Sequence, residues 1–364
     1  MSNSKTWRAA AIGRTRGGNY GHGLHLPYKD LDNFEFFAIA DENEEGRQKA
    51  QEESGAPRAY ADYREMLEKE KPEVVSVCPR WTDCHVEMVT ACLEAGSHVY
   101  CEKPFTASLE EGDQLIAAAE AVRKKIAVAH TAVYLPGVQK LKKLLDGGLI
   151  GNVEAIYAHG KQDRRGGGED MIVLGTHQFN MMRYLAGDVA WLSSHVTVEG
   201  RDIEPDDVRE PTESVGLVAG DCINTYFAFA NGIAGFFDSR RYEDGAGKQR
   251  YAMEIVGSEG RISMRGGGGD DLRLYPHPVF SPADDEQCWK PVEDVPEAKL
   301  TGNQAAVLDL IEAVENDRKP LSSDRDAVAA LEMILGAYES QITGARAKFP
   351  MKNRRHPLVA WIES

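Results

Sequence analysis

Residues 9–21 of the chain read AAAIGRTRGGNYG, an apolar run that ends in a glycine-rich turn. A short, continuous apolar run is typical of a parallel strand that is buried on both faces. The turn matches the dinucleotide-binding fingerprint Gly-x-Gly-x-x-Gly at Gly13 and Gly18, whereas Thr15 occupies the middle glycine position. The first glycine permits a tight turn, and the last allows strand and helix to pack closely. The stretch predicts a strand, a phosphate-binding turn and the start of a helix, with a generic strand-to-helix loop as the alternative.

Further apolar runs follow this strand and alternate with polar stretches of helical periodicity. The apolar runs are Phe36–Ala40, Val74–Cys78, His98–Cys101 and Ile126–Ala129, and the helical stretches are Glu44–Ser54, Arg64–Glu70, Cys84–Ala95 and Leu109–Lys124. Before the last stretch, Ser108 and Glu111 have the spacing of a capping box. Repeated strand-helix-strand units favour a doubly wound parallel sheet, an α/β Rossmann domain, over residues 1–130.

An acidic residue ends the second apolar run. Asp41 lies about 20 residues beyond the last glycine of the turn, where a carboxylate accepts hydrogen bonds from the adenosine ribose hydroxyls and repels a 2′-phosphate. NAD is therefore the expected cofactor. NADP stays open because Arg14 or Arg16 could offset the acidic charge. Asp41 also suits a helix cap just before Glu44, and the two roles are compatible.

The fourth strand is followed by the tripeptide Glu102-Lys103-Pro104. In a parallel sheet, ligands bind at the carboxyl ends of the strands. Pro104 restricts Lys103 to extended geometry, which can aim the ammonium group into a cleft. An exposed charged loop is the alternative for the tripeptide alone, and the glycine turn and Asp41 favour the ligand-binding interpretation.

Composition and charge argue against several classes of protein. The chain has 364 residues, enough for two domains, and a net charge of −16, which repels nucleic-acid phosphates and anionic lipid. Its six cysteines form no Cys-x-x-Cys pair, and we find neither a signal-peptide pattern nor a long apolar span, so a cytoplasmic protein is expected. His22 and His25 lack further ligands at metal-binding spacing, so no metal is expected.

From about residue 131 the pattern changes to that of an α+β domain. The expected strands are Val153–His159, Trp191–Val198, Ser214–Val218, Ile223–Phe229, Ile233–Ser239 and Tyr251–Val256, and the expected helices are Val138–Leu145, Asn303–Asn316 and Asp324–Gly344. Several strands alternate apolar and polar residues, which indicates an antiparallel sheet. Gly166–Gly168 and Gly266–Gly269 are interpreted as mobile loops. The first could close over a polar substrate, with an ordinary surface loop as the alternative.

Taken together, these motifs resemble the Gfo/Idh/MocA oxidoreductase family. The resemblance rests on Glu102-Lys103-Pro104 after His98–Cys101, Cys78-Pro79 followed by His85, Gly175-Thr176-His177, Met253–Gly260 and Arg354–Leu358. It implies an NAD(P)-binding Rossmann domain and, over residues 131–364, a domain with a large, mostly antiparallel sheet that often forms a subunit interface. A homodimer or homotetramer and a sugar, cyclitol or related polyol substrate are implied as well.

The resemblance also implies roles for individual residues. Lys103 and His177 are the expected catalytic residues: Lys103 contacts the reacting hydroxyl and the nicotinamide region, and His177 transfers a proton or orients the substrate. The expected cofactor-binding residues are Gly13, Thr15, Arg16, Gly17, Gly18, Asp41, Cys78, Pro79, His85, Glu102 and Lys103. The expected substrate-binding residues are Lys103, Asp163, Arg164, His177, Asn180 and Arg240, although a solvated strand edge would explain Arg240 equally well.

The catalytic half of the motif set departs from the family pattern. Val173 stands where the family usually has an aspartate, Asn180 replaces a second aspartate, and Thr131 and Val133 fall on its Asn-x-Arg. Valine cannot exchange a proton with a hydroxyl group. An oxidoreductase that transfers hydride from a secondary alcohol to nicotinamide is the main hypothesis. The first alternative is a redox-neutral sugar-modifying enzyme that retains its NAD and cleaves a glycoside or epimerises a sugar through a 3-keto intermediate. The second is a non-catalytic nucleotide-bound sensor.

Overall fold

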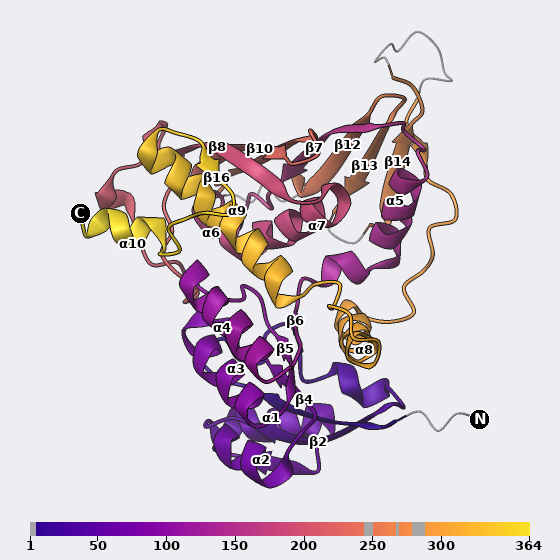
Figure 1. Ribbon diagram of the computed structural model, residues 1–364, viewed down its shortest axis with the longest axis vertical. Helices are drawn as coiled ribbons and strands as arrows, with labels where there is room; N and C mark the ends of the chain where they lie inside the picture. Colours follow the sequence, from indigo (N-terminus) through magenta and orange to yellow (C-terminus); the bar gives the residue numbers. More distant parts are fainter. Residues whose placement is uncertain (1–4, 244–249, 267–268, 279–287) are drawn as a thin grey trace. The chain divides into compact units, whose positions relative to one another are not determined.

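The computed structural model describes residues 5–243, 250–266, 269–278 and 288–364. The chain divides into two compact units (Figure 1). The first comprises residues 1–131, 211–216 and 300–328, and the second comprises residues 132–210, 217–299 and 329–364.

Residues 300–328, which the sequence assigned to the second domain, pack with the first unit. Their last part runs along the edge of the first sheet, where Ala127 and Ser323 form an antiparallel bridge. The Val128 amide donates to the Ser322 carbonyl at 2.8 Å. This return of the chain to an open sheet edge supplies hydrogen bonds that the edge strand would otherwise lack.

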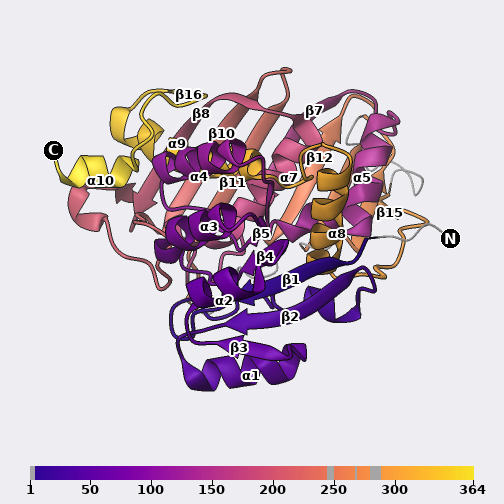
Figure 2. The same cartoon turned by 60° about the horizontal axis from the view of Figure 1, so that its bottom comes forward.

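The first unit is built on a six-stranded parallel sheet with strand order β3-β2-β1-β4-β5-β6. The strands are β1 (Trp7–Ile12), β2 (Phe34–Ala40), β3 (Arg58–Tyr60), β4 (Val74–Val77), β5 (His98–Cys101) and β6 (Ile126–Val128). Its helices are α1 (Glu44–Ser54), α2 (Tyr63–Glu70), α3 (His85–Glu94), α4 (Leu109–Ala121) and α8 (Gly302–Glu315). Figure 2 shows β1, β2 and β3 side by side. The strand order reverses next to β1, so the topological switch point of the doubly wound fold lies between β1 and β4.

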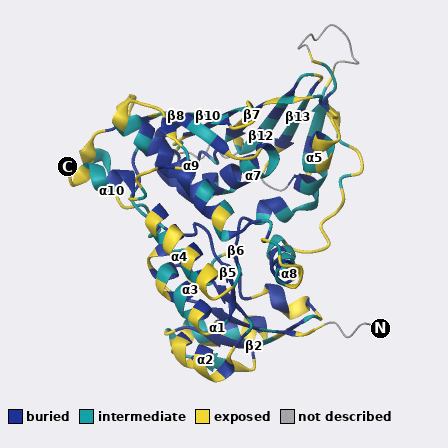
Figure 3. Cartoon of the chain, viewed as in Figure 1, coloured by how far each residue is buried: buried dark blue, intermediate teal, exposed yellow. Residues whose placement is uncertain are grey.

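Local sequence signals explain how these elements begin. Ser108 and Glu111 form the expected capping box at the start of α4. The cap of α1 is Asn43, whose side chain accepts from the Gly46 amide at 2.9 Å. Every residue of β4 and β5 is buried, which agrees with their continuous apolar sequence (Figure 3). The short strand β3 has no continuous apolar run, and the sequence did not predict it.

The helix expected after the glycine-rich turn is absent. Residues 13–26 form a series of turns, and the next helical element is the short 3₁₀ helix η1 (Pro27–Asp30). Arg16, Asn19 and Gly18 have φ values of 70°, 53° and 93°, which an α-helix cannot contain. The turn closes on itself instead, because the Asn19 amide donates to the Arg14 carbonyl at 2.9 Å.

The second unit contains a large, mostly antiparallel sheet with strand order β15-β14-β13-β12-β7-β11-β10-β8-β16. The strands are β7 (Val153–His159), β8 (Val189–Val198), β9 (Arg201–Asp202), β10 (Cys222–Phe229), β11 (Ala234–Arg240), β12 (Ala252–Gly257), β13 (Arg261–Arg265), β14 (Asp271–Tyr275), β15 (Lys290–Pro291) and β16 (Ala347–Lys348). Only β7 and β11 pair in parallel among these described strands. The strand expected at Ser214–Val218 does not form, and Val218 makes a single isolated bridge with Arg209.

Helices cover one face of this sheet. They include α5 (Pro136–Asp146) and α7 (Thr176–Ala186), which Figure 1 shows beneath the strands. A helical turn α6 (Gly168–Asp170) and a π-helix η4 (Met171–Gly175) lead directly into α7. The remaining helices are α9 (Asp324–Thr343), of which residues 329–343 belong to this unit, and α10 (Pro357–Ile362).

The glycine run Gly166–Gly168 is a buried, tightly packed turn, which corrects the expectation of a mobile loop. A Cβ atom on Gly166 would lie 2.2 Å from the Arg240 carbonyl oxygen. On Gly167 it would lie 2.6 Å from the backbone of Asp221. These glycines are therefore required by close approach of backbone to backbone. The second run, Gly266–Gly269, lies partly outside the described residues.

Candidate functional site

A pocket of about 240 Å³ opens at the carboxyl ends of the strands in the first unit, beside the switch point. Open α/β sheets bind their ligands at this place. The pocket is lined by Ile12, Gly13, Arg14, Ala40, Asp41, Glu42, Ala61, Tyr63, Arg64, Asp83, Cys84, Glu87 and Met88. Sequence reasoning anticipated Gly13 and Asp41 on this wall. It did not anticipate the far wall from α2 and α3, because only the fold brings those helices to the ends of β1 and β2.

Asp41 is the most constrained polar group of the pocket. Its side chain is buried, and Oδ2 accepts from the Thr15 amide at 3.0 Å and from the Thr15 hydroxyl at 2.7 Å. Oδ1 accepts from the Asn43 amide at 2.9 Å. A carboxylate has about four acceptor positions, so roughly one remains for a further donor. Thr15, at the middle position of the fingerprint, thus ties the turn to the end of β2.

The glycines of the turn make room for neighbours within the first unit. A Cβ atom on Gly13 would lie 2.3 Å from the Tyr20 ring, whose hydroxyl is buried without a hydrogen-bond partner in the described structure. Burial, together with the negative charge of Asp41, raises the pKa of Tyr20, so its hydroxyl stays protonated as a donor. Gly18 approaches the loop after β4, where a Cβ atom would lie 2.4 Å from the Arg80 amide nitrogen. Gly18 therefore packs the turn against a loop, whereas the fingerprint predicts packing against a helix.

The rim of the pocket carries two ion pairs. Arg14 Nη1 lies 2.8 Å from Asp83 Oδ1, and Arg64 pairs with Glu87. The pocket also contains the acidic side chains of Asp41 and Glu42, so its carboxylates outnumber its guanidinium groups. Gly17 is buried under this rim, whereas the side chain of Arg16 is exposed.

These features fit the adenosine portion of a dinucleotide. Asp41 retains an acceptor position for a ribose hydroxyl, and the buried Tyr20 hydroxyl lies behind Gly13, close enough to Asp41 to feel its charge. The missing helix after β1 removes the helix N-terminus that usually faces a pyrophosphate. Backbone amides of the turn residues are the groups that remain for that part of the ligand.

The other predicted cofactor residues lie around the ends of β4 and β5. His85 is fully buried, and its two ring nitrogens lie 2.8 Å from the Phe105 carbonyl oxygen and 2.7 Å from that of Pro79. It therefore links the loops that follow these two strands. Burial holds the pKa of Cys78 well above its ordinary value, so that residue is an inert thiol.

Glu102 and Lys103 are buried at the end of β5. Glu102 is 0 % exposed and Lys103 is 3 % exposed. Glu102 Oε2 accepts from the Lys103 amide at 2.7 Å, and Oε1 accepts from the His22 amide at 3.0 Å. The His22 ring pairs with the same oxygen. The glycine-rich turn and the Glu-Lys-Pro segment, far apart in sequence, are thus directly hydrogen-bonded.

In the second unit, the predicted residues fall on α7 and on the turn before it. His177 is half-buried, and Asn180 is buried with an Oδ1 atom that has no partner in the described structure. Val173 is buried on the π-helix, an element often found at functional sites. Tyr184, expected on the same face as His177, is half-buried, and burial raises its pKa.

The charged residues predicted to bind substrate differ in their surroundings. The carboxylate of Asp163 accepts from Arg165 Nη2 at 2.8 Å and from Arg165 Nε at 3.2 Å. Burial opposes this charge, but the hydrogen bonds from Arg165 outweigh it and lower the pKa of Asp163 to about 2. Asp163 therefore holds the turn together. Arg164 and Arg240, at the end of β11, are exposed.

Asp170 is a residue that sequence reasoning missed. It is 0 % exposed, and its Oδ2 accepts from the Ser239 hydroxyl at 2.6 Å and from the Gln162 amide at 3.1 Å. Its Oδ1 has no partner in the described structure. Burial raises the pKa of Asp170. The sequence signal that could have marked Asp170 as a candidate site residue is its position next to a glycine run and seven residues before His177.

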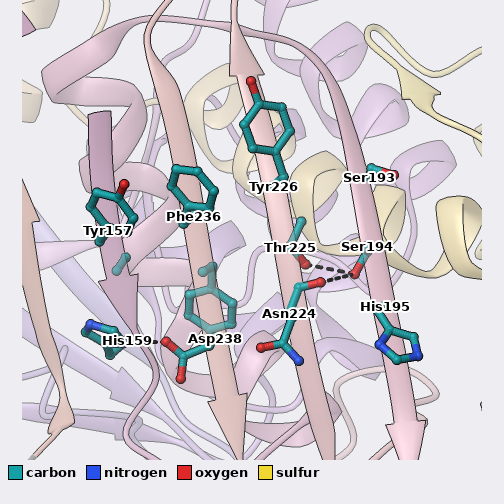
Figure 4. A pocket seen from close by; sticks show the side chains of 12 residues that line it. Tyr157, His159, Ser193, Ser194, His195, Asn224, Thr225, Tyr226, Phe236 and Asp238 are labelled. Carbon is teal, nitrogen blue, oxygen red and sulfur yellow. Dashed lines mark hydrogen bonds and ion pairs between the residues drawn. The ribbon is translucent and has the colours of Figure 1, made fainter. Parts of the chain in front are cut away.

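A second hollow, of about 530 Å³, lies on the sheet face of the second unit and contains none of the predicted site residues. Figure 4 shows its two cross-strand rows. Tyr157, Phe236 and Tyr226 form an aromatic row, with the first two rings stacked at 4.6 Å. A parallel polar row consists of His159, Asp238, Asn224 and His195.

Two family models match the chain. The model for the oxidoreductase family with an NAD-binding Rossmann fold covers residues 8–130, and the model for the C-terminal alpha/beta domain of that family covers residues 142–349. The chain belongs to the Gfo/Idh/MocA oxidoreductase family. The predicted family, the two-part fold class and the NAD-binding Rossmann domain are thereby confirmed.

Relatives within this family are distant. The chain is 28 % identical to myo-inositol 2-dehydrogenase of Thermotoga maritima over 64 % of this chain and 69 % of that protein. It is 26 % identical to scyllo-inositol 2-dehydrogenase (NAD⁺) of Bacillus subtilis over 95 % and 97 %. A levoglucosan dehydrogenase solved with NADH and L-sorbose has the same fold, with a TM-score of 0.76 at 21 % identity over 95 % of this chain and 100 % of that one.

Two features of the described residues bear on partners. Among them, no helix is long and apolar enough to cross a bilayer. The same residues contain no cluster of three or more histidine, cysteine or acidic side chains that could hold a metal ion.

Proposed function

We propose that this protein is an NAD-dependent dehydrogenase that oxidises a secondary alcohol of a sugar or cyclitol. The observation that carries the proposal is the pocket at the switch point, where Asp41 retains an acceptor position beside a glycine-rich turn. The family supports an oxidoreductase, and two relatives are named inositol dehydrogenases. We assign the substrate class by analogy with these relatives.

The charge of the pocket supports NAD over NADP. A 2′-phosphate near Asp41 would meet Asp41, Glu42, Asp83 and Glu87, and both arginines of the wall are already paired with the last two. Repulsion between like charges in a partly buried site is poorly screened. The protein should therefore bind NAD more tightly than NADP.

In the proposed mechanism, bound NAD supplies the acceptor for a hydride. Asp41 would hold the adenosine ribose, and backbone amides of the turn would hold the pyrophosphate. Lys103 stabilises the alkoxide that develops on the substrate oxygen. His177 accepts the hydroxyl proton, a task suited to an imidazole whose ordinary pKa is about 6.5. Asn180 and Arg240 contribute hydrogen bonds to other hydroxyl groups.

The test is a panel of sugars and cyclitols assayed with NAD and NADP, followed by Lys103→Ala. We expect NADH formation with at least one polyol, and a loss of about a hundredfold or more in kcat for Lys103→Ala while the Kd for NAD stays within about twofold. Lys49→Ala is the matched control because Lys49 is a surface residue, 75 % exposed. Unchanged turnover in Lys103→Ala would contradict the role of this lysine.

A redox-neutral reaction is the second candidate, and Val173 favours it. This buried side chain cannot exchange a proton at a position where the family pattern has an acid. The enzyme would then retain its cofactor and return the hydride within one cycle, as in glycoside cleavage through a 3-keto sugar. Purified protein that carries tightly bound NAD and converts a glycoside without net NADH would distinguish this reaction. A protein that binds NAD but turns over none of these substrates would instead be a sensor.

We further propose that two copies associate through the open sheet face of the second unit. Tyr157, Phe236 and Tyr226 form a row of exposed or half-buried rings there, with a polar row beside it. An aromatic centre flanked by polar groups is typical of a protein interface. A second copy offers the same two rows in self-complementary form.

A further inference from the structure

The buried carboxylate of Glu102 depends on the glycine-rich turn for its partners. A carboxylate that is 0 % exposed is unstable unless it is paired and hydrogen-bonded. Within the described structure its oxygens accept from the Lys103 amide, the His22 amide and the His22 ring. Because an ionised carboxylate can only accept, Nδ1 of His22 must be the donor in this contact.

The charge on Glu102 is retained despite its burial. Burial alone would raise the pKa of this carboxyl group, but the hydrogen bond and charge of His22 and the charge of Lys103 lower it below its ordinary value. The titratable groups that face this contact are Lys103 and the thiols of Cys78 and Cys101, and burial keeps both thiols neutral. The two hydrogen bonds from His22 therefore come from outside the Glu-Lys-Pro segment and tie Glu102 to the turns that follow β1.

Several contacts fix His22 in this position. Gly21 has a φ of 58°, and a Cβ atom there would lie 2.4 Å from the Cys78 carbonyl oxygen and 2.7 Å from Glu102 Cγ. On the other side, Asn303 Nδ2 donates to the His22 carbonyl at 2.9 Å, and the Tyr100 hydroxyl donates to Asn303 Oδ1 at 2.7 Å. The His22 side chain is nevertheless 53 % exposed, so it can be replaced without opening a cavity in the core.

We propose that His22 is a positioning residue for Lys103: its two hydrogen bonds hold the Glu102 carboxylate in place, and Glu102 in turn fixes the backbone and the electrostatic surroundings of the lysine. This inference rests on the proposed function, because it assumes that Lys103 faces the nicotinamide and the reacting alcohol. His22 does not itself contact the substrate. Removal of the ring would take away one of the hydrogen bonds that hold the Glu102 carboxylate against the Lys103 amide.

The experiment compares His22→Gln, which can still donate a hydrogen bond to Glu102, with His22→Ala, which cannot. For His22→Ala we expect kcat to fall by roughly tenfold or more with the Kd for NAD within about twofold. For His22→Gln we expect a smaller loss of kcat, because its amide group restores a donor. Lys49→Ala is the control, since the Lys49 side chain is 75 % exposed and its removal should leave both kcat and the Kd for NAD unchanged.

A second readout needs no turnover. The emission of bound NADH should differ between the wild type and His22→Ala, because Lys103 changes position beside the nicotinamide, and His22→Gln should restore the wild-type emission. Wild-type protein that binds NADH but oxidises no polyol would contradict the proposed function, and the emission would still test His22. If His22→Ala leaves kcat and emission unchanged, if His22→Gln loses as much activity as His22→Ala, or if His22→Ala weakens NAD binding as much as it slows turnover, the positioning role is wrong.

Discussion

At the residue scale, the side chain of Asp41 binds both the glycine-rich turn, through Thr15, and the start of α1, through Asn43. Thr15 and Asn43 already donate three hydrogen bonds to it, so the carboxylate is oriented before any ligand arrives. Such orientation lowers the entropic cost of binding. The same hydrogen bonds occupy most of the acceptor positions of the carboxylate, which limits the number of hydrogen bonds that a ribose can form with it.

Replacement of Asp41 should change cofactor choice. Asp41→Asn keeps the shape but removes the charge, so we expect the Kd for NAD to rise by about tenfold and the Kd for NADP to fall. Calorimetric titration with both dinucleotides measures the ratio, with Asp30→Asn, an exposed site, as the control. Equal changes for NAD and NADP would show that Asp41 only shapes the turn.

Asp170 should make stability depend on pH. Its pKa is raised in the folded protein, so folding favours the protonated form. Below the unfolded pKa of 3.8, Asp170 is protonated in both the folded and the unfolded protein, and no stability is lost. The free energy of unfolding falls as the pH rises through the folded pKa.

Asp170→Asn cannot ionise, so its advantage over the wild type should grow with pH. We expect the free energy of unfolding to increase by on the order of 1 kcal/mol at pH 8 and to match the wild type near pH 3. Urea unfolding of the ligand-free protein at several pH values measures this. A difference that does not vary with pH would mean that ionisation of Asp170 is not involved.

At the element scale, the turn around Gly166–Gly168 holds α6 against the ends of its neighbouring strands. Gly167 has a φ of 85° and no room for a Cβ atom, whereas Gly200, between β8 and β9, has a φ of 83° and open space around it. The two positions share a positive φ of similar size and differ in packing.

Alanine at these two positions separates the two effects. Gly200→Ala should cost about 1 kcal/mol through its positive φ alone. Gly167→Ala should cost about 2–3 kcal/mol more, because its Cβ atom collides with the Asp221 backbone. Thermal unfolding of both variants measures the difference. Equal losses would mean that the turn relaxes easily, as a mobile loop would.

Local sequence located elements of both units, including β7, β8, β10, β11 and β12 of the second. Continuous apolar runs identified β1, β2, β4, β5 and β6, and the Ser108–Glu111 box located α4. The absent helix after β1 could not be predicted in this way. Glycine is compatible both with a helix start and with left-handed turns, and the contacts of Gly18 with the loop after β4 decide between them.

On the scale of the whole molecule, the proposed association through the sheet face can be tested by charge. Tyr157 is 39 % exposed in the aromatic row, so Tyr157→Lys would bury an unpaired cation in the contact. We expect the mass measured by sedimentation to fall to that of the monomer. Ile362→Lys, at a site 48 % exposed on α10, should leave the mass unchanged. A wild-type monomer would contradict the proposed association.

The sequence by itself determined the alternation of strands and helices in the first unit, the family, and the placement of Asp41 and Lys103 at strand ends. Those features depend on short-range periodicity and on motifs that any parallel sheet presents at the same edge. Only the tertiary structure decided that residues 300–328 return to the first unit, that Thr15 and His22 bind the carboxylates of Asp41 and Glu102, and that Asp170 is buried. Such contacts join residues far apart in the chain, and burial, which sets the cost of an unpaired charge, exists only once the chain has folded.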